Sequence, residues 1–154
     1  MHICAVGRLR AGPESDLVDD YLNRFNRSGR SLGLGPAEVT EVEDKKGGGR
    51  SAEAALLSRL IPEKSFVCAL DERGRMQSSP AFATLLADQR DQGCRDMVFI
   101  IGGADGLDPS LRSRADHLLS FGQMVWPHML ARVMLSEQLY RAGSILAGSP
   151  YHRV

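Results

Sequence analysis

Short apolar runs alternate with segments of helical periodicity along nearly the whole chain, and this alternation restricts the fold more than any other feature. The apolar runs are HICAVG (2–7), AEVTEVE (37–43), SFVCAL (65–70), DMVFIIGG (96–103) and LLSFG (118–122). The helical patterns fall at 15–29, 51–61, 78–93, 108–118 and 128–148. Strands that alternate with helices are joined by right-handed crossovers and pair in parallel. We therefore predict an α/β fold: a mainly parallel sheet with helices on both faces.

The chain is expected to form one domain over residues 1–154. Its 154 residues, 43% of them apolar, suffice for one hydrophobic core. We find no internal repeat, and KKGGGR (45–50) is too short to link two domains. Side chains that can cap helices predict where several of them begin, at Ser15, Ser51, Ser78 and Asp108.

The charge balance and the cysteines limit the classes of partner and compartment. Nineteen Lys and Arg balance nineteen Asp and Glu, so an anionic partner has to be met by a local patch. Such patches are the region from Pro127 onward and the KKGGGR loop, although a charge run of that kind is usually only solvated. The three cysteines are few and widely spaced, as is typical of reduced core thiols. Without a signal-like leader or a membrane-length apolar run, we expect a cytoplasmic protein.

The last helical pattern, 128–148, is apolar around most of its circumference. A helix that covers one face of a sheet needs only a single apolar stripe. This helix is therefore expected either to lie deep in the core or to pack against a second copy of the chain. Glu137 and Arg141 are spaced for an ion pair.

Two loops are candidates for ligand binding, because ligands of parallel sheets bind beyond the carboxyl ends of the strands. Gly102 and Gly103 follow a wholly apolar strand and would let the backbone approach a ligand, although a plain tight turn explains them too. Their spacing fits neither a dinucleotide fingerprint nor a P-loop. The segment SFGQMVWPH (120–128) holds the only tryptophan and could accept a flat group such as a purine, or merely pack in the core.

The four histidines lack the spacing of metal ligands, so the sequence predicts chemistry without a metal. The chain ends in SPYHRV (149–154), which places an aromatic ring, an imidazole and a guanidinium side by side. Chain termini are usually frayed, polar and uninformative, so this combination of side chains after a helix-stopping proline raises the question of what it does.

Taken in order, these motifs resemble a known family. LDERG (70–74), IIGGADGL (100–107) and PHMLARVMLSEQLYRAGSILAGSPYHR (127–153) are similar to the RlmH family of SPOUT-class RNA methyltransferases over the whole chain. The resemblance implies a C-terminal trefoil knot, a homodimer, and S-adenosylmethionine as the methyl donor. The cofactor would lie against Leu70, Gly102, Gly103, Gly122, Gln123, Met124, Val125, Trp126 and Pro127.

The family methylates N3 of a pseudouridine in a hairpin loop of large-subunit ribosomal RNA, within the assembled ribosome. By this resemblance Tyr151 would orient the base, His152 would assist loss of the imide proton, and Arg153 and Arg132 would bind phosphate. His128 and Arg141 would shape the substrate pocket.

Two alternatives remain open from the sequence. The chain could be a ribosome-binding module that has lost catalysis, but such a protein would have no need for the polar ending. It could also methylate transfer RNA, for which an added RNA-binding domain or a broad basic face would be expected.

Overall fold

The computed structural model describes residues 1–153. The strands are β1 (His2–Val6), β2 (Glu38–Val42), β3 (Phe66–Met76), β4 (Met97–Ile101) and β5 (His117–Ser120). The helices are α1 (Pro13–Gly29), the 3-10 helix η1 (Arg30–Leu32), α2 (Gly49–Ser58), α3 (Ser79–Asp91), α4 (Pro109–Arg114) and α5 (His128–Leu146). None of the helices in this part of the chain is both long enough and apolar enough to cross a bilayer.

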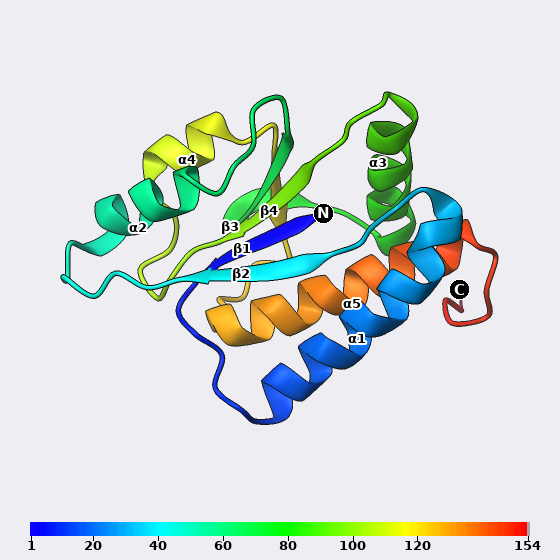
Figure 1. Ribbon diagram of the computed structural model, residues 1–154, viewed down its shortest axis with the longest axis horizontal. Helices are drawn as coiled ribbons and strands as arrows, with labels where there is room; N and C mark the ends of the chain where they lie inside the picture. Colours follow the sequence, from blue (N-terminus) through cyan, green and yellow to red (C-terminus); the bar gives the residue numbers. More distant parts are fainter. Residues whose placement is uncertain (154) are drawn as a thin grey trace.

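The five strands form one sheet in the order β2-β1-β4-β3-β5, and every pairing in it is parallel. Figure 1 shows the sheet edge-on, with helices above and below it. The predicted α/β class, the parallel sheet and the fifth strand are therefore confirmed. The threading of the C-terminal segment into a knot stays a prediction.

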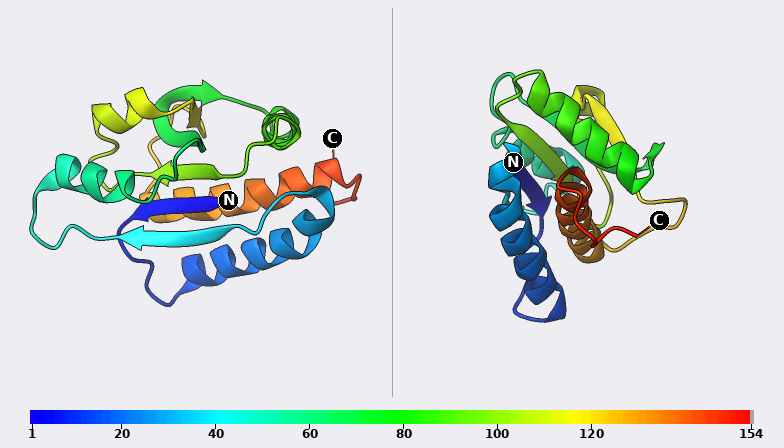
Figure 2. Two further views of the ribbon diagram at one scale, coloured as in Figure 1. Left: turned by 45° about the horizontal axis from the view of Figure 1, so that its top comes forward. Right: turned by 90° about the vertical axis from the view of Figure 1, so that its right-hand side faces the viewer.

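Alternate residues of the strands face two separate hydrophobic cores. In β1, Ile3 and Ala5 pack with α1, α3 and α5, whereas Cys4 and Val6 pack with α2 and α4. Both views in Figure 2 show α1 and α5 of the first layer lying side by side. Burial raises the pKa of the Cys4 thiol to about 11 and that of the Cys68 thiol to about 12, which keeps both thiols protonated near neutral pH.

The all-round apolar character of α5 is explained by its place between α1 and α3. Leu135 and Leu139 have no exposed surface, and α5 contacts both of these helices as well as the sheet. The core alternative thus accounts for the middle of the helix. Its first turn differs, because Met129 and Leu130 are 38% and 39% exposed.

Two predicted helix starts are wrong. The helix expected from Ser15 begins at Pro13, with Gly12 as the capping residue. The helix expected from Ser51 begins at Gly49, because the Asp44 carboxylate accepts from the backbone amides of Lys46 and Gly48 and folds the chain earlier. Ser78 and Asp108 do cap α3 and α4, as expected.

Strand β3 is longer than predicted and contains an irregularity. It continues to Met76, and both Leu70 and Arg75 pair with Leu119 of β5, so residues 71–74 bulge out of the ladder. A Cβ atom at Gly74 would lie 2.7 Å from the backbone carbon of Leu119. Only glycine fits there without a backbone shift.

Candidate active site

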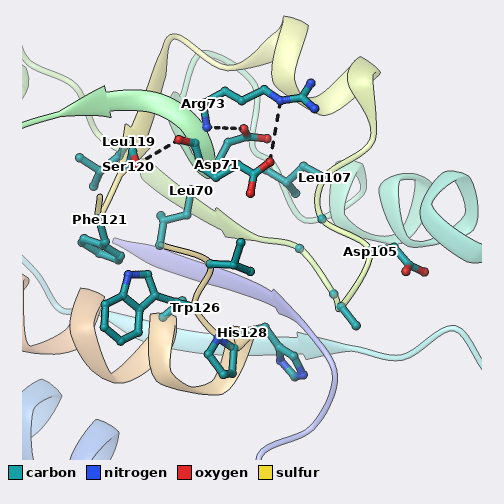
Figure 3. Close-up of a pocket in the computed structure, with 18 of the residues that line it drawn as sticks. Leu70, Asp71, Arg73, Asp105, Leu107, Leu119, Ser120, Phe121, Trp126 and His128 are labelled. Atoms are coloured by element: carbon teal, nitrogen blue, oxygen red, sulfur yellow. Dashed lines mark hydrogen bonds and ion pairs between the residues drawn. The ribbon is translucent and has the colours of Figure 1, made fainter. Parts of the chain in front are cut away.

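A cavity of about 620 Å³ opens at the carboxyl edge of the sheet, the edge at which parallel sheets bind ligands. Its walls come from the β3 bulge, the loop after β4, and the loop that joins β5 to α5. Figure 3 shows Leu70 and Leu107 on one side of the cavity and Trp126 and His128 on the other. The cavity is large enough for a nucleoside-sized ligand.

The loop after β4 owes its shape to the two predicted glycines. A Cβ atom at Gly102 would lie 2.9 Å from the backbone carbon of Gly106, and one at Gly103 would lie 3.0 Å from Oε1 of Glu53. Gly103 and Gly106 also form an isolated antiparallel bridge. A side chain at residue 102 would displace the backbone of Gly106, and one at residue 103 would press on the side chains of Glu53 and Val6, so the turn requires glycine at Gly102 and favours it at Gly103.

The β3 bulge is fixed by Asp71, whose side chain is only 6% exposed. Its carboxylate accepts from the backbone amide of Arg73 at 2.9 Å and pairs with Nη1 of Arg112 in α4 at 3.4 Å. Figure 3 draws the contact of Asp71 with the amide of Arg73, and the pairing with Arg112 ties the bulge to α4.

The third wall is the loop of residues 121–127. The Ser120 hydroxyl donates to the carbonyl of Gly122 at 2.9 Å and anchors the start of this loop. Within residues 1–153, the backbone amides of residues 123–126 donate to no protein acceptor. This wall therefore offers main-chain donors beside an apolar surface that includes Trp126.

Arg132 holds the start of α5 against the ends of β1 and β2. Its guanidinium donates to Oε1 of Glu41 at 2.6 Å and to the carbonyl oxygens of Val6 at 2.7 Å and Gly7 at 2.6 Å. The side chain is 0% exposed, and burial lowers its pKa although the Glu41 carboxylate opposes that shift. The expectation that Arg132 binds phosphate is therefore wrong, because a phosphate has no access to the buried guanidinium. Arg132 instead joins α5 to the ends of β1 and β2.

His128 lies at the junction between this buried ion pair and the cavity. Its Nδ1 is 3.3 Å from Nη2 of Arg132, and its ring lines the cavity. Burial, and then the positive charge of Arg132, lower its pKa below the usual value, so the imidazole is neutral at pH 7.

The residues of the C-terminal motif lie elsewhere, against the second half of α5. Oε1 of Glu137 accepts from Nε of Arg141 at 2.9 Å and from the hydroxyl of Tyr151 at 3.0 Å. The Tyr151 ring packs on that of Tyr140 with a centroid distance of 4.6 Å, and Nδ1 of His152 is 3.4 Å from Nη1 of Arg141. The predicted ion pair of Glu137 and Arg141 is confirmed.

Burial and hydrogen bonding together raise the pKa of the Tyr151 hydroxyl. Burial is the largest cause of its raised pKa, and hydrogen bonds to Tyr21 and Glu137 add to the shift. The phenol therefore stays protonated and acts as a hydrogen-bond donor. Glu137 thus fixes the direction of the C-terminal segment through Tyr151. The sequence predicted only its ion pair with Arg141 and not this second contact.

The predicted site residues fall into two groups in space. The cavity is lined by eight of the nine predicted cofactor residues, Leu70, Gly102, Gly103, Gly122, Met124, Val125, Trp126 and Pro127. Gln123 lies in the same loop but outside the lining, and it is exposed. Tyr151, His152, Arg153 and Arg141 do not line the cavity. From His128 to Glu137 the helix advances nine residues, or about 14 Å at 1.5 Å per residue.

Sequence reasoning missed several residues of the cavity wall. Asp71, Asp105 and Arg112 line it. Asp71 and Asp105 stand inside the quoted motifs LDERG and IIGGADGL, and a carboxylate directly after an apolar strand run or glycine turn was the available signal. Arg112 offered no such signal, because it reaches the cavity from α4 through tertiary packing alone. Within the described residues, no three His, Cys, Asp or Glu side chains gather as a metal site would require.

Comparison with known proteins defines the class to which this fold and cavity belong. Residues 1–152 match the family described as "Predicted SPOUT methyltransferase". The chain therefore belongs to the family of SPOUT methyltransferases.

Its curated relatives are named more narrowly. The chain is 68% identical over 153 residues to the ribosomal RNA large subunit methyltransferase H of Roseobacter denitrificans, covering 99% of this chain and 98% of the relative. It is 65% identical over 154 residues to the protein of the same name from a Ruegeria species, covering 100% and 99%.

A solved structure supports the fold. A probable methylase family protein from Haemophilus influenzae superposes with a TM-score of 0.51 at 12% identity, covering 99% of this chain and 70% of the other.

Proposed function

We propose that this protein is a homodimeric enzyme that uses S-adenosylmethionine to methylate N3 of a pseudouridine in a hairpin loop of large-subunit ribosomal RNA. The substrate is the assembled ribosome, and we expect the enzyme in the cytoplasm. The observation that carries the proposal is the cavity at the carboxyl edge of the sheet, lined by the glycine turn and by the loop before α5.

The cavity fits S-adenosylmethionine in shape and in chemistry. Gly102 and Gly103 bring bare backbone to the wall, and the amides of residues 123–126, which donate to no acceptor in the described chain, suit the acceptor nitrogens of adenine. The lining holds three carboxylates, Asp71, Glu72 and Asp105, and three arginines, Arg50, Arg73 and Arg112, which suits a ligand that carries both signs of charge. When bound, this cofactor supplies a methyl group on a positively charged sulfur, an electrophile that requires no metal.

The second half of the site is the C-terminal segment, which in one chain lies too far from its own cavity. Tyr151 is bound beside Glu137, well along α5 from His128 at the cavity. We therefore propose that the segment of one subunit acts at the cavity of the other. Exposed apolar side chains around the cavity loop and the first turn of α5 support a subunit contact there; they are Met124, Val125, Trp126, Met129 and Leu130.

The residues of the segment then have separate functions. Tyr151, a rigid aromatic ring with a protonated hydroxyl, orients the target base. N3 of the base must lose its proton as the new carbon–nitrogen bond forms, and the His152 imidazole is the proposed acceptor. Arg153 is exposed and binds phosphate. Arg141 shapes the substrate pocket by positioning Tyr151, because the Cζ atom of Arg141 lies 4.9 Å from the centre of the Tyr151 ring.

The test is transfer of labelled methyl from S-adenosylmethionine to ribosomes that lack the modification, with free ribosomal RNA and transfer RNA as parallel substrates. A variant truncated after Ser149 is the matched protein control, because it removes the segment and leaves α5 intact. We expect methylation of whole ribosomes only, at N3 of one pseudouridine, with cofactor binding but no transfer by the truncated variant.

Other outcomes would overturn the proposal. Methylation of transfer RNA would assign the enzyme to another substrate. Cofactor binding without transfer to any RNA by the full chain would favour a ribosome-binding module.

A further inference from the structure

Two loops that the proposed chemistry does not use lie side by side at the carboxyl edge of the sheet. They are residues 7–12, after β1, and residues 43–50, after β2. The strands are paired neighbours, and the amide of Gly7 donates to the carbonyl of Val42 at 2.8 Å. The amide of Leu9 also donates to Oε1 of Glu41 at 2.8 Å. Figures 1 and 2 show both loops leaving the sheet at the end where α5 begins.

These loops carry five exposed cationic side chains, which are Arg8, Arg10, Lys45, Lys46 and Arg50. Within residues 1–153, none of the five forms an ion pair with a carboxylate. The loops contain two acidic residues: Glu43 is exposed, and Asp44 is engaged with the loop's own amides. The two loops together have a net charge of +3, five cations less two carboxylates, in a chain whose net charge is zero.

The cationic loops border the candidate active site. Arg50 is part of the cavity lining. On the other loop, a Cβ atom at Gly7 would lie 3.1 Å from Cε1 of His128, which also lines the cavity. These five cations without an ion-pair partner in the described chain therefore lie near the rim of the cavity where a target base has to enter.

We propose that residues 7–12 and 43–50 form a surface that binds the phosphates of the RNA strand flanking the target base. This inference rests on the proposed function and adds the surface that docks the substrate. Unpaired cations at the rim of a cavity suit a polyanion, whereas a neutral base offers them no partner. Arginine matches phosphate with a bidentate fork, and lysine supplies a mobile point charge. Because the rest of the chain has a net charge of −3, zero for the whole chain less +3 for these loops, this surface orients the RNA toward the cavity.

The surface is tested with a variant that neutralises the four cations outside the cavity lining, R8Q/R10Q/K45Q/K46Q. Arg50 is kept because it belongs to the cavity wall. The matched control, R59Q/R95Q, removes two exposed cations from the opposite edge of the sheet, after α2 and before β4; neither forms an ion pair in the described chain. Ribosome binding by sedimentation and KM for methylation of ribosomes are both measured over a range of salt concentrations.

We expect the four-site variant to bind ribosomes at least tenfold more weakly at physiological salt. The slope of log affinity against log salt should fall by about 3, since each phosphate contact contributes roughly 0.7–0.9. Its affinity for S-adenosylmethionine and its rate at saturating ribosome should match those of the wild type. The lysine-to-arginine variant K45R/K46R should keep wild-type binding.

Each remaining outcome decides a separate question. Equal ribosome affinity and salt slope in the four-site variant and the R59Q/R95Q control would overturn the proposed surface. If the four-site variant unfolds, K45Q/K46Q, confined to an exposed loop, gives the same test at half the expected change in slope. A wild-type protein that binds ribosomes but transfers no methyl group would refute the proposed function while leaving the surface testable by binding alone.

Discussion

The buried ion pair of Arg132 and Glu41 predicts that a change at Glu41, an inconspicuous strand residue, strongly destabilises the protein. In Glu41→Gln the carboxylate is lost while the guanidinium of Arg132, which is 0% exposed, stays in place. Arg132 keeps its bonds to the carbonyl oxygens of Val6 and Gly7, but neither carries a countercharge. An uncompensated buried charge then remains beside the candidate active site.

The size of the effect follows from the burial of the two partners. Removing one partner of a buried pair costs about 3–5 kcal/mol. Glu41 is 25% exposed and water reaches it, so we expect the lower end, about 3 kcal/mol. For a chain of 154 residues this corresponds to a fall in Tm of about 6–12 °C.

Urea unfolding at fixed protein concentration measures this cost, because the stability of the proposed dimer would depend on concentration. Glu43→Gln, an exposed carboxylate just beyond the same strand, is the control and should change the free energy of unfolding by less than about 0.5 kcal/mol. The double variant E41Q/R132M should lose about 1–3 kcal/mol less than the sum of the single losses. A single Glu41→Gln variant as stable as the control would refute the reasoning.

Three further predictions follow from single contacts. Gly74→Ala should lower the free energy of unfolding in urea by about 1–3 kcal/mol, because its Cβ would lie 2.7 Å from the backbone of Leu119; no loss would contradict the packing described. Glu137→Gln should speed amide hydrogen exchange around Tyr151 without changing affinity for S-adenosylmethionine, whereas unchanged exchange would mean that the segment is held by other contacts. His128 has a pKa below that of the unfolded chain, about 6.5, so the unfolded state takes up its proton first and stability falls as pH drops below 6.5. His128→Gln should make that fall shallower in unfolding measurements between pH 7 and 5, and an unchanged slope would contradict the assignment.

The elements of the fold that depend on local pattern could be predicted from the sequence. The wholly apolar run before Gly102 is a central strand, and Asp108 caps the helix that follows. Both could be predicted because strand burial and helix capping depend on residues that are neighbours in the sequence. The glycine turn and the loop with Trp126 could be placed at one edge because parallel strands end together. The extent of β3 could not be predicted from the sequence, because the pairing of Arg75 depends on a partner strand more than forty residues away.

The sequence predicted single residues of the candidate site but not how they are arranged relative to one another. Glu41 follows the alternation of a half-exposed strand and carries no local sign that it pairs with Arg132, 91 residues later. The resemblance assigned Arg132 to phosphate, because the sequence of a motif does not show whether its arginine is buried or exposed. The separation of Tyr151 from the cavity is a property of the folded helix, and it became apparent only with the structure.

The central claim is that the cavity of one subunit and the C-terminal segment of the other form one catalytic site. It is tested most directly by mixing two inactive chains: one truncated after Ser149, the other carrying Gly102→Val, whose Cβ would lie 2.9 Å from the backbone carbon of Gly106 and displace the turn that lines the cavity. After unfolding and refolding together, half of the dimers are mixed, and each mixed dimer has one complete site of two. The account predicts methyl transfer to ribosomes at about a quarter of the wild-type rate, with each chain alone inactive. A mixture as inactive as its components would contradict it.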